Sequence, residues 1–247
     1  MIEQQINIPT RAGSVDTFIC RPERGGPWPG IIFYMDAPGI REELRDMARR
    51  IGTVGYYVIL PNLYYRHGHG VTLTSEATVQ GSPERARMTS LMNSLSNGQI
   101  AEDTRDLLAY IDKQPEVRKG PLGCVGYCMS GPFVTIAGAE FPDRFGAIAS
   151  LYGVAVANDK PDSAHLRVGK IRGEAYYGFG ETDELTPPAD IERLRKALAE
   201  AKTRSTIEIY PGVGHAFAFP SRQQRYDKPS AERHWERLFD LFRRNLH

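Results

Sequence analysis

The sequence lacks the cysteine patterns of disulfide-rich and metal-binding proteins. It has three cysteines in 247 residues (Cys20, Cys124 and Cys128), and none of their spacings is typical of a zinc site. An odd number of cysteines in a chain of this length argues against a disulfide framework and favours a reducing compartment. We therefore expect a cytoplasmic protein with no metal site and one cysteine in a special role.

The sequence also lacks a charge excess and a long hydrophobic run. It has 31 basic and 30 acidic residues, so its formal net charge is +1, which gives no indication of a nucleic-acid partner. No apolar run reaches the roughly 18 residues of a membrane span, and the first residues do not form a secretory signal. We expect a small-molecule substrate, no nucleic acid, no membrane, and a monomer or weak homodimer. Four arginines near the C-terminus are interpreted as a solvated helix face: Arg233, Arg237, Arg243 and Arg244.

Buried strand patterns alternate with amphipathic helix patterns from residue 30 to the end of the chain. This alternation predicts an α/β fold in a single domain, 1–247, with a doubly wound, mostly parallel sheet and helices on both faces. The expected strands cover 2–8, 14–20, 31–35, 55–61, 121–126, 147–153, 174–180 and 206–210, and the expected helices cover 40–54, 99–113, 130–140, 187–201 and 230–245.

Residues 64–98 interrupt this alternation. They contain His67 and His69, several serines and threonines, and apolar residues at helical spacing between Met88 and Leu95. We expect an irregular segment with one short amphipathic helix, serving either as a lid or substrate loop or as surface padding. The two histidines have no carboxylate nearby in the sequence, so a solvent-exposed or substrate-contacting role is favoured over a metal site.

The strongest chemical signal is the segment Gly126-Tyr127-Cys128-Met129-Ser130-Gly131, between an expected strand and an expected helix. Small residues on both sides permit a sharp turn that holds its central residue in a strained conformation. Such a turn lifts the Cys128 thiol out of the sheet and places it at a helix N-terminus, which favours negative charge. A buried structural cysteine is the alternative interpretation.

Two further residues complete a candidate catalytic triad. Asp183 follows the strand expected at 174–180, and His215 follows the strand expected at 206–210. In a doubly wound sheet, functional sites lie beyond the carboxyl ends of the strands, where both residues are placed. Each has a simpler interpretation, a helix cap for Asp183 and a plain loop histidine for His215. The order nucleophile, acid, histidine is that of the α/β-hydrolase fold, and it favours the joint interpretation.

This triad predicts a covalent mechanism. His215 removes the thiol proton or pairs with an existing thiolate, and Asp183 orients the imidazole. Cys128 then attacks an ester or lactone carbonyl and forms a thioester, which water hydrolyses with help from His215. The backbone N–H groups of Met129 and Ala37 are the expected donors to the oxyanion.

The sequence resembles the dienelactone hydrolase (carboxymethylenebutenolidase) family from about residue 15 to 245. The resemblance rests on the 126–131 segment, Leu-Tyr-Gly at 151–153, Gly-Glu-Thr-Asp at 180–183, Gly-His-Ala-Phe at 214–217 and the strand at 56–64. It implies the α/β-hydrolase fold, a Cys-His-Asp triad, no cofactor and small cyclic ester substrates.

The chain departs from the family pattern at three positions. Ser130 stands where the family usually has glycine, and serine is small enough for the turn. Asp36 stands where the family often has a glutamate that interacts with the resting cysteine. Phe219 stands near the position of an arginine that binds the substrate carboxylate. Arg222, Arg225 and Arg66 are candidates to replace that arginine, although each is also interpretable as a surface residue.

The pocket and the exact activity are therefore open. We expect Asp36, Tyr64, Tyr152, Phe217 and Phe219 to line or support the substrate site, with core packing as the alternative for the aromatic residues. The leading hypothesis is a hydrolase of small esters or lactones. The alternatives are thioester or phosphotriester hydrolysis at the same site, a peptide-derived substrate, and a binding or redox-sensing protein that uses Cys128 without turnover.

Overall fold

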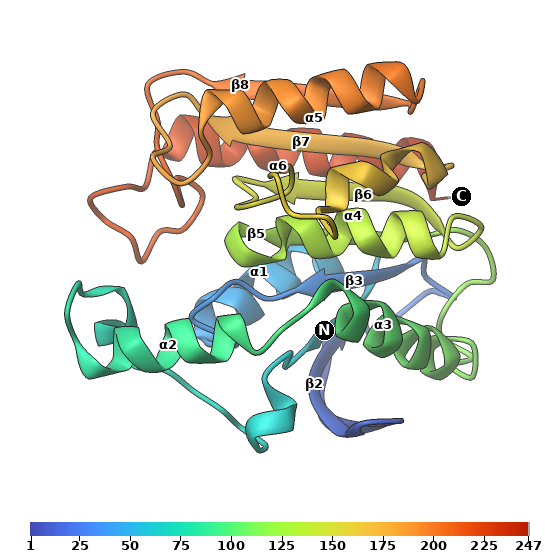
Figure 1. Ribbon diagram of the computed structural model, residues 1–247. Coiled ribbons are helices and arrows are strands. Elements are labelled where there is room, and N and C mark those ends of the chain that lie inside the picture. The colour runs from blue at the N-terminus through green and yellow to red at the C-terminus, as the bar shows by residue number, and fades with distance from the viewer. Residues whose placement is uncertain (247) are drawn as a thin grey trace. The chain divides into compact units, whose positions relative to one another are not determined.

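The structure is a computed structural model that describes residues 1–246 (Figure 1). Contacts within the chain divide it into two compact units, Met1–Lys119 and Gly120–His247. Each unit is described separately below.

The first unit is built on four strands in the order β1-β2-β4-β3. Strands β1 and β2 form an antiparallel hairpin, β2 is antiparallel to β4, and β4 is parallel to β3. Every residue of β3 and β4 is buried, as their continuous apolar sequences predict. The bounds are β1 Ile2–Thr10, β2 Gly13–Arg21, β3 Gly30–Tyr34, β4 Tyr57–Pro61, α1 Glu42–Thr53 and α3 Asn97–Ile111.

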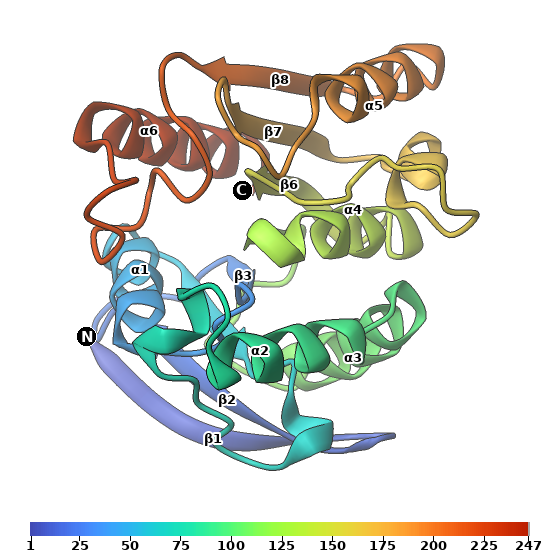
Figure 2. The same cartoon turned by 60° about the vertical axis from the view of Figure 1, so that its left-hand side comes forward.

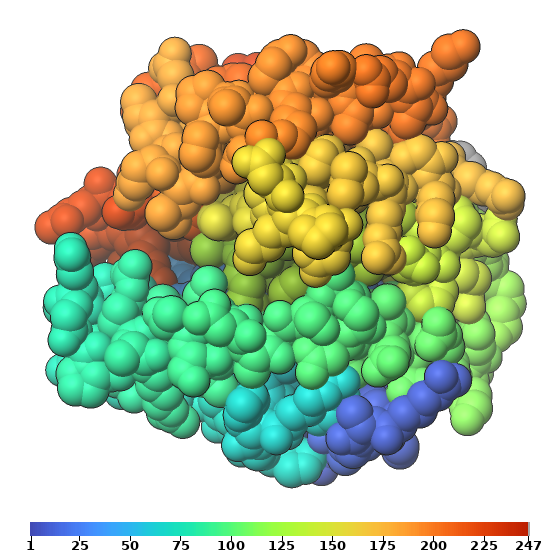
Figure 3. All heavy atoms as spheres, in the orientation of Figure 1, coloured from blue at the N-terminus to red at the C-terminus, as the bar shows by residue number. Residues whose placement is uncertain are grey.

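The segment 64–98 holds more regular structure than the sequence pattern predicted. The expected amphipathic helix is α2, Pro83–Asn93, which begins at Ser82, whose hydroxyl accepts the Arg85 N–H. Two short 3₁₀ turns, Tyr65–His67 and Ser75–Thr78, precede it. Figure 3 shows this segment, cyan to green, on the surface of the first unit.

The second unit contains four parallel strands in the order β5-β6-β7-β8 (Figure 1). Helix α4 packs on β5 and β6 and α6 packs on β6 and β7. Figure 2 shows α6 on one face of these strands and α4 and α5 on the other. The bounds are β5 Leu122–Tyr127, β6 Phe145–Leu151, β7 Glu174–Gly180, β8 Ser205–Tyr210, α4 Gly131–Glu140, α5 Pro188–Glu200 and α6 Lys228–Asn245.

The elements confirm the predicted α/β class, and most of their bounds lie within two residues of the expected ones. The 3₁₀ turns were not predicted, and the longest of them is a run at Ala164–Lys170, where the Ser163 side chain makes no capping hydrogen bond. Among residues 1–246, no helix is both long and apolar enough to cross a bilayer.

The C-terminal arginines lie on the outer face of α6, and the structure gives each of them an acidic partner. Arg233 and Arg237 both contact Glu208 on β8. Arg243 contacts Asp240 within the helix, and Arg244 contacts Glu174 on β7. Three carboxylates thus pair with the four guanidinium groups and offset most of their charge.

The packing of α6 generates a stability prediction at two adjacent positions. Phe242 is fully buried, so Phe242→Ala is expected to lower the free energy of unfolding by about 3–5 kcal/mol. Arg243 is 79% exposed in its side chain, and Arg243→Ala is expected to cost less than about 0.5 kcal/mol. Denaturant unfolding of the two variants measures both values, and equal losses would contradict this description of the helix.

Candidate active site

The turn after β5 holds Cys128 in a strained conformation. Cys128 has φ 54°, in the left-handed region that residues with a side chain rarely adopt, and it is the first residue after the strand. A 3₁₀ turn, Cys128–Ser130, then leads directly into α4. The thiol is partly exposed, whereas those of Cys20 and Cys124 are buried. The turn therefore has the geometry that the sequence predicted for a nucleophile.

Two glycines make this turn sterically possible. A Cβ atom on Gly126 would lie 2.7 Å from the Ser130 carbonyl oxygen and 2.9 Å from the Ser130 Cβ. A Cβ atom on Gly131 would lie 2.3 Å from the Cα of Gly153, in the loop after β6. The turn thus tolerates serine at position 130 because position 126 has no side chain. Ser130 itself is fully buried, which disfavours it as a nucleophile.

His215 and Asp183 form a buried hydrogen-bonded pair. The imidazole Nδ1 lies 2.8 Å from Asp183 Oδ2, and each residue is 6% exposed. The other carboxylate oxygen, Oδ1, accepts the Leu185 N–H at 2.8 Å, which fixes the plane of the carboxylate. Because a carboxylate only accepts hydrogen bonds, Nδ1 carries the proton that bridges the pair. In the neutral ring, Nε2 is then left as the basic nitrogen.

The loop that carries His215 is held against the loop that carries Asp183. The Thr182 N–H donates to the Val213 carbonyl at 3.0 Å. A Cβ atom on Gly180 would lie 2.5 Å from that carbonyl oxygen, so the approach requires glycine at this position. These backbone contacts bring together two residues that are 32 positions apart in the sequence.

Opposing effects act on the charge of His215. Burial lowers the pKa of the imidazole, but the hydrogen bond to Asp183 and the nearby Cys128 sulfur outweigh it and raise the pKa from 6.5 to about 10. The Cys128 sulfur acts on the ring both as a hydrogen-bond partner and through its charge. This arrangement favours the charged imidazolium form of His215.

The aromatic residues expected near the substrate are buried in the second unit. Tyr152, Phe217 and Phe219 are each no more than 1% exposed. The Tyr152 ring contacts His215, Phe217 and Phe219, with centroid distances of 5.1, 5.2 and 5.8 Å. The structure therefore places Tyr152 against His215 and Phe219 in the same aromatic cluster. Substrate contact by these residues stays a prediction.

Three expected site residues belong to the first unit. Tyr64 is buried, and its hydroxyl donates to the Ala37 carbonyl at 2.7 Å, which fixes the loop after β3. Asp36 has a partner that the sequence did not indicate: Arg41 contacts its two carboxylate oxygens at 2.6 and 3.1 Å. Arg41 also contacts Glu43 at 2.7 Å. A role for Ala37 in an oxyanion hole and a contact of Asp36 with the resting thiol stay predictions.

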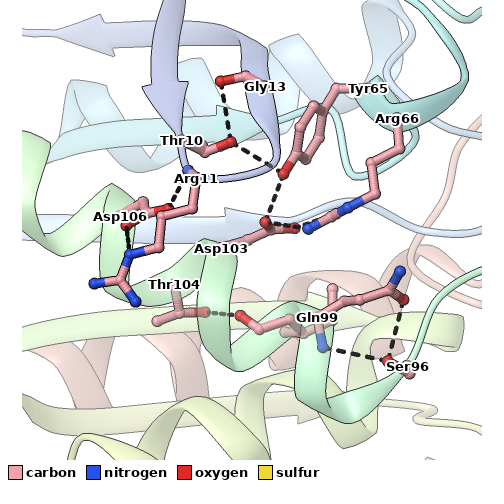
Figure 4. Close-up of polar contacts among 11 residues, drawn as sticks. Thr10, Arg11, Gly13, Tyr65, Arg66, Ser96, Gln99, Asp103, Thr104 and Asp106 are labelled. Atoms are coloured by element: carbon pink, nitrogen blue, oxygen red, sulfur yellow. Dashed lines mark hydrogen bonds and ion pairs between the residues drawn. The ribbon is translucent and has the colours of Figure 1, made fainter.

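Two of the three candidate arginines already have acidic partners. Arg66 forms a bidentate pair with Asp103 at 2.7 and 2.8 Å, and Tyr65 donates to the same carboxylate (Figure 4). Arg225 contacts Glu184 at 2.9 Å. Binding a substrate carboxylate would require either arginine to give up or share its present partner.

The two histidines of the segment 64–98 have polar contacts within the first unit. His67 Nε2 lies 2.8 Å from the Ser94 hydroxyl, and His69 Nδ1 lies 3.8 Å from Asp16. Within residues 1–246, no group of three or more His, Cys, Asp or Glu side chains has the arrangement of a metal site.

The paired geometry of His215 and Asp183 predicts the effect of removing the negative charge. Asp183→Asn keeps the size of the side chain but removes the charge that favours the imidazolium, so the pKa of His215 is expected to fall from about 10. An NMR titration of the His215 ring measures it. Asp190→Asn, a matched change at a residue that pairs with Arg193, should leave the titration unchanged. An unaltered His215 titration in Asp183→Asn would contradict the conclusion that the Asp183 charge raises the pKa of His215.

Comparisons with known proteins identify the family of the chain. A family model described as "Dienelactone hydrolase family" matches residues 15–246. A Synechocystis sp. protein named "Putative carboxymethylenebutenolidase" is 28% identical, covering 98% of this chain and 96% of the relative. A Klebsiella pneumoniae structure named "Putative Dienelactone Hydrolase" is 24% identical with TM-score 0.84, covering 98% of both chains. A "Dienelactone Hydrolase-like Promiscuous" phosphotriesterase from metagenomic libraries is 16% identical with TM-score 0.83, covering 100% of this chain and 99% of that one. The predicted resemblance is confirmed, and the chain belongs to the dienelactone hydrolase family.

Proposed function

We propose that this protein hydrolyses small ester or lactone bonds with Cys128 as nucleophile, His215 as proton carrier and Asp183 as the group that orients His215. The observation that carries the proposal is the pairing of His215 Nδ1 with Asp183 at 2.8 Å next to a partly exposed cysteine at a strained turn. Membership of the dienelactone hydrolase family supports the same class of reaction.

Acylation begins from the thiolate–imidazolium pair. The Cys128 sulfur forms a bond to the substrate carbonyl carbon, and the carbonyl electron pair moves onto oxygen. When this intermediate collapses, the bond to the leaving oxygen breaks, and the alkoxide takes the Nε2 proton of His215. For a lactone, the leaving alcohol stays attached to the acyl group. The products of this half are a thioester on Cys128 and a neutral His215.

Deacylation uses the change in charge that acylation causes. The sulfur of a thioester is uncharged, so one of the effects that raise the pKa of His215 is lost. His215 can then accept a proton from water as the hydroxide attacks the thioester carbonyl. Collapse releases the carboxylic acid and returns the thiolate–imidazolium pair. The same ring thus acts first as an acid and then as a base.

The developing oxyanion needs N–H donors placed before the reaction. Met129 directly follows the nucleophile and lies in the first turn of the segment leading into α4, so its N–H is the proposed first donor. Ala37 is the proposed second donor, because it lies in the loop after β3 and its carbonyl is fixed by Tyr64.

The test of the nucleophile is Cys128→Ala with 4-nitrophenyl acetate as substrate. We expect kcat to fall by at least about 10³-fold, as for loss of other covalent nucleophiles. Cys124→Ala, a matched change at a buried cysteine of β5, and Ser130→Ala should both keep most of the activity. Tandem mass spectrometry of acid-quenched enzyme should place the acyl group on Cys128 itself and not on Ser130, which lies in the same peptide. Wild-type turnover by Cys128→Ala, or an acyl group on Ser130, would overturn the proposal.

The substrate is proposed to be uncharged near the scissile bond. Phe219 is buried at the position where the family pattern has an arginine, and Arg66 and Arg225 already pair with carboxylates. A matched pair of lactones that differ only in a methyl ester or a free carboxylate tests this. We expect kcat/KM to be at least equal for the methyl ester. A tenfold preference for the free carboxylate would show that an arginine of this chain does bind the acid.

A further inference from the structure

We propose that Tyr152 is a positioning residue that sets the orientation of the His215 ring and ties its loop to the nucleophile turn. This inference rests on the proposed triad, and it assigns a role to a residue outside that triad. The loop after β6 carries Tyr152, and β6 lies between β5 and β7 in the sheet. Tyr152 is therefore placed between the strand that leads to Cys128 and the strand that leads to Asp183.

The backbone at Tyr152 is strained and firmly held. Tyr152 has φ 40°, which is rare for a bulky residue and persists only where the surroundings impose it. Its N–H donates to the Gly178 carbonyl of β7 at 2.6 Å. Two residues later, the Val154 N–H donates to the carbonyl of Cys128 itself at 2.9 Å. The segment 152–154 is thus bonded to the acid strand on one side and to the nucleophile on the other.

Close packing of glycines adds a third restraint. A Cβ atom on Gly153 would lie 2.8 Å from the Cα of Gly131, at the start of the helix that follows the nucleophile. No side chain fits between these two backbones. The position of Tyr152 relative to the Cys128 turn is therefore fixed by backbone contacts, and its ring is carried into place with them.

The ring of Tyr152 makes an edge-to-face contact with the His215 imidazole. The centroids are 5.1 Å apart and the rings are inclined at 68°. The same ring contacts Tyr127, which precedes the nucleophile, at 5.7 Å, and Phe217, in the histidine loop, at 5.2 Å. One buried side chain thus touches both the nucleophile strand and the histidine loop.

This contact adds to the restraints that other groups place on the imidazole. The hydrogen bond to Asp183 holds the ring at Nδ1, and the Cys128 sulfur acts on it as a hydrogen-bond partner and through its charge. The Tyr152 ring adds a restraint by packing against the imidazole, so that Nε2 stays directed to the reacting sulfur. A misplacement of about 1 Å in a catalytic group is enough to cost on the order of 10²-fold in rate.

The experiment compares Tyr152→Leu with Phe145→Leu, a matched change at the opposite end of β6 where Phe145 is equally buried. With 4-nitrophenyl acetate, Tyr152→Leu is expected to lower kcat by about 10–100-fold and to change KM by less than about threefold. It is also expected to lower the pKa of His215 toward 6.5 in an NMR titration, because the ring loses its fixed position beside Asp183 and Cys128. Phe145→Leu should lower the melting temperature but leave kcat and the titration unchanged.

Two additional variants distinguish the effect of the Tyr152 aromatic ring from that of the strained backbone at this position. Tyr152→Phe keeps the aromatic ring and is expected to restore kcat to within about threefold of the wild type. Tyr152→Asn removes the ring but tolerates positive φ, so it gives a folded protein for the same measurements if Tyr152→Leu does not fold. Wild-type kcat together with a wild-type His215 titration in a folded variant without the ring would overturn the inference.

The two proposals fail in distinguishable ways. If Cys128→Ala keeps full turnover, the covalent mechanism is wrong, yet the His215 titration still reports whether Tyr152 controls the ring. If Cys128→Ala is inactive but the ring-deleted Tyr152 variants titrate and turn over normally, the triad stands and the positioning role is wrong.

Discussion

The left-handed backbone at Cys128 is the constraint on which the rest of the second unit depends. Placing a residue with a side chain at φ 54° costs of the order of 1–3 kcal/mol, which neighbouring contacts must offset. Those contacts require glycine at positions 126 and 131, because each of these residues faces another backbone at a distance that excludes a Cβ atom. Gly131 faces Gly153, so position 153 requires glycine as well. The strained backbone at Cys128 thus determines residues on both sides of the turn and in the loop after the next strand.

The parallel arrangement of β5 to β8 converts this local constraint into a site. Parallel strands end at the same edge of a sheet, so the loops after β5, β6, β7 and β8 are neighbours although they are far apart in sequence. Cys128, Tyr152, Asp183 and His215 occupy these four loops in that order. Four non-glycine residues with positive φ lie in three of these loops: Cys128, Tyr152, Ala155 and Ala216. The strain is concentrated at the edge where the chemistry is proposed.

The sequence predicted the strand and helix alternation and the loops that carry Cys128, Asp183 and His215, because those depend on local patterns. Apolar runs mark buried strands, and the spacing of glycines marks the sharp turn at Cys128. The sequence did not indicate the pairing of Asp36 with Arg41, or the contact of Tyr152 with His215, since both depend on side-chain directions in three dimensions. The run of turns at Ala164–Lys170 was missed because 3₁₀ turns have no repeating apolar pattern.

The neighbours of Ser130 and Phe219 explain two of the departures from the family pattern. Ser130 is tolerated because the facing residue, Gly126, has no side chain. Phe219 extends an aromatic cluster that already includes Tyr152 and Tyr127, so replacing an arginine here exchanges a charge for packing next to the histidine loop. A guanidinium at that position would need a buried anionic partner or a charged substrate to offset its desolvation. The apolar side chain at position 219 is therefore consistent with the proposed preference for uncharged substrates. The Phe219 ring also packs against the Tyr152 ring and limits the movement of Tyr152.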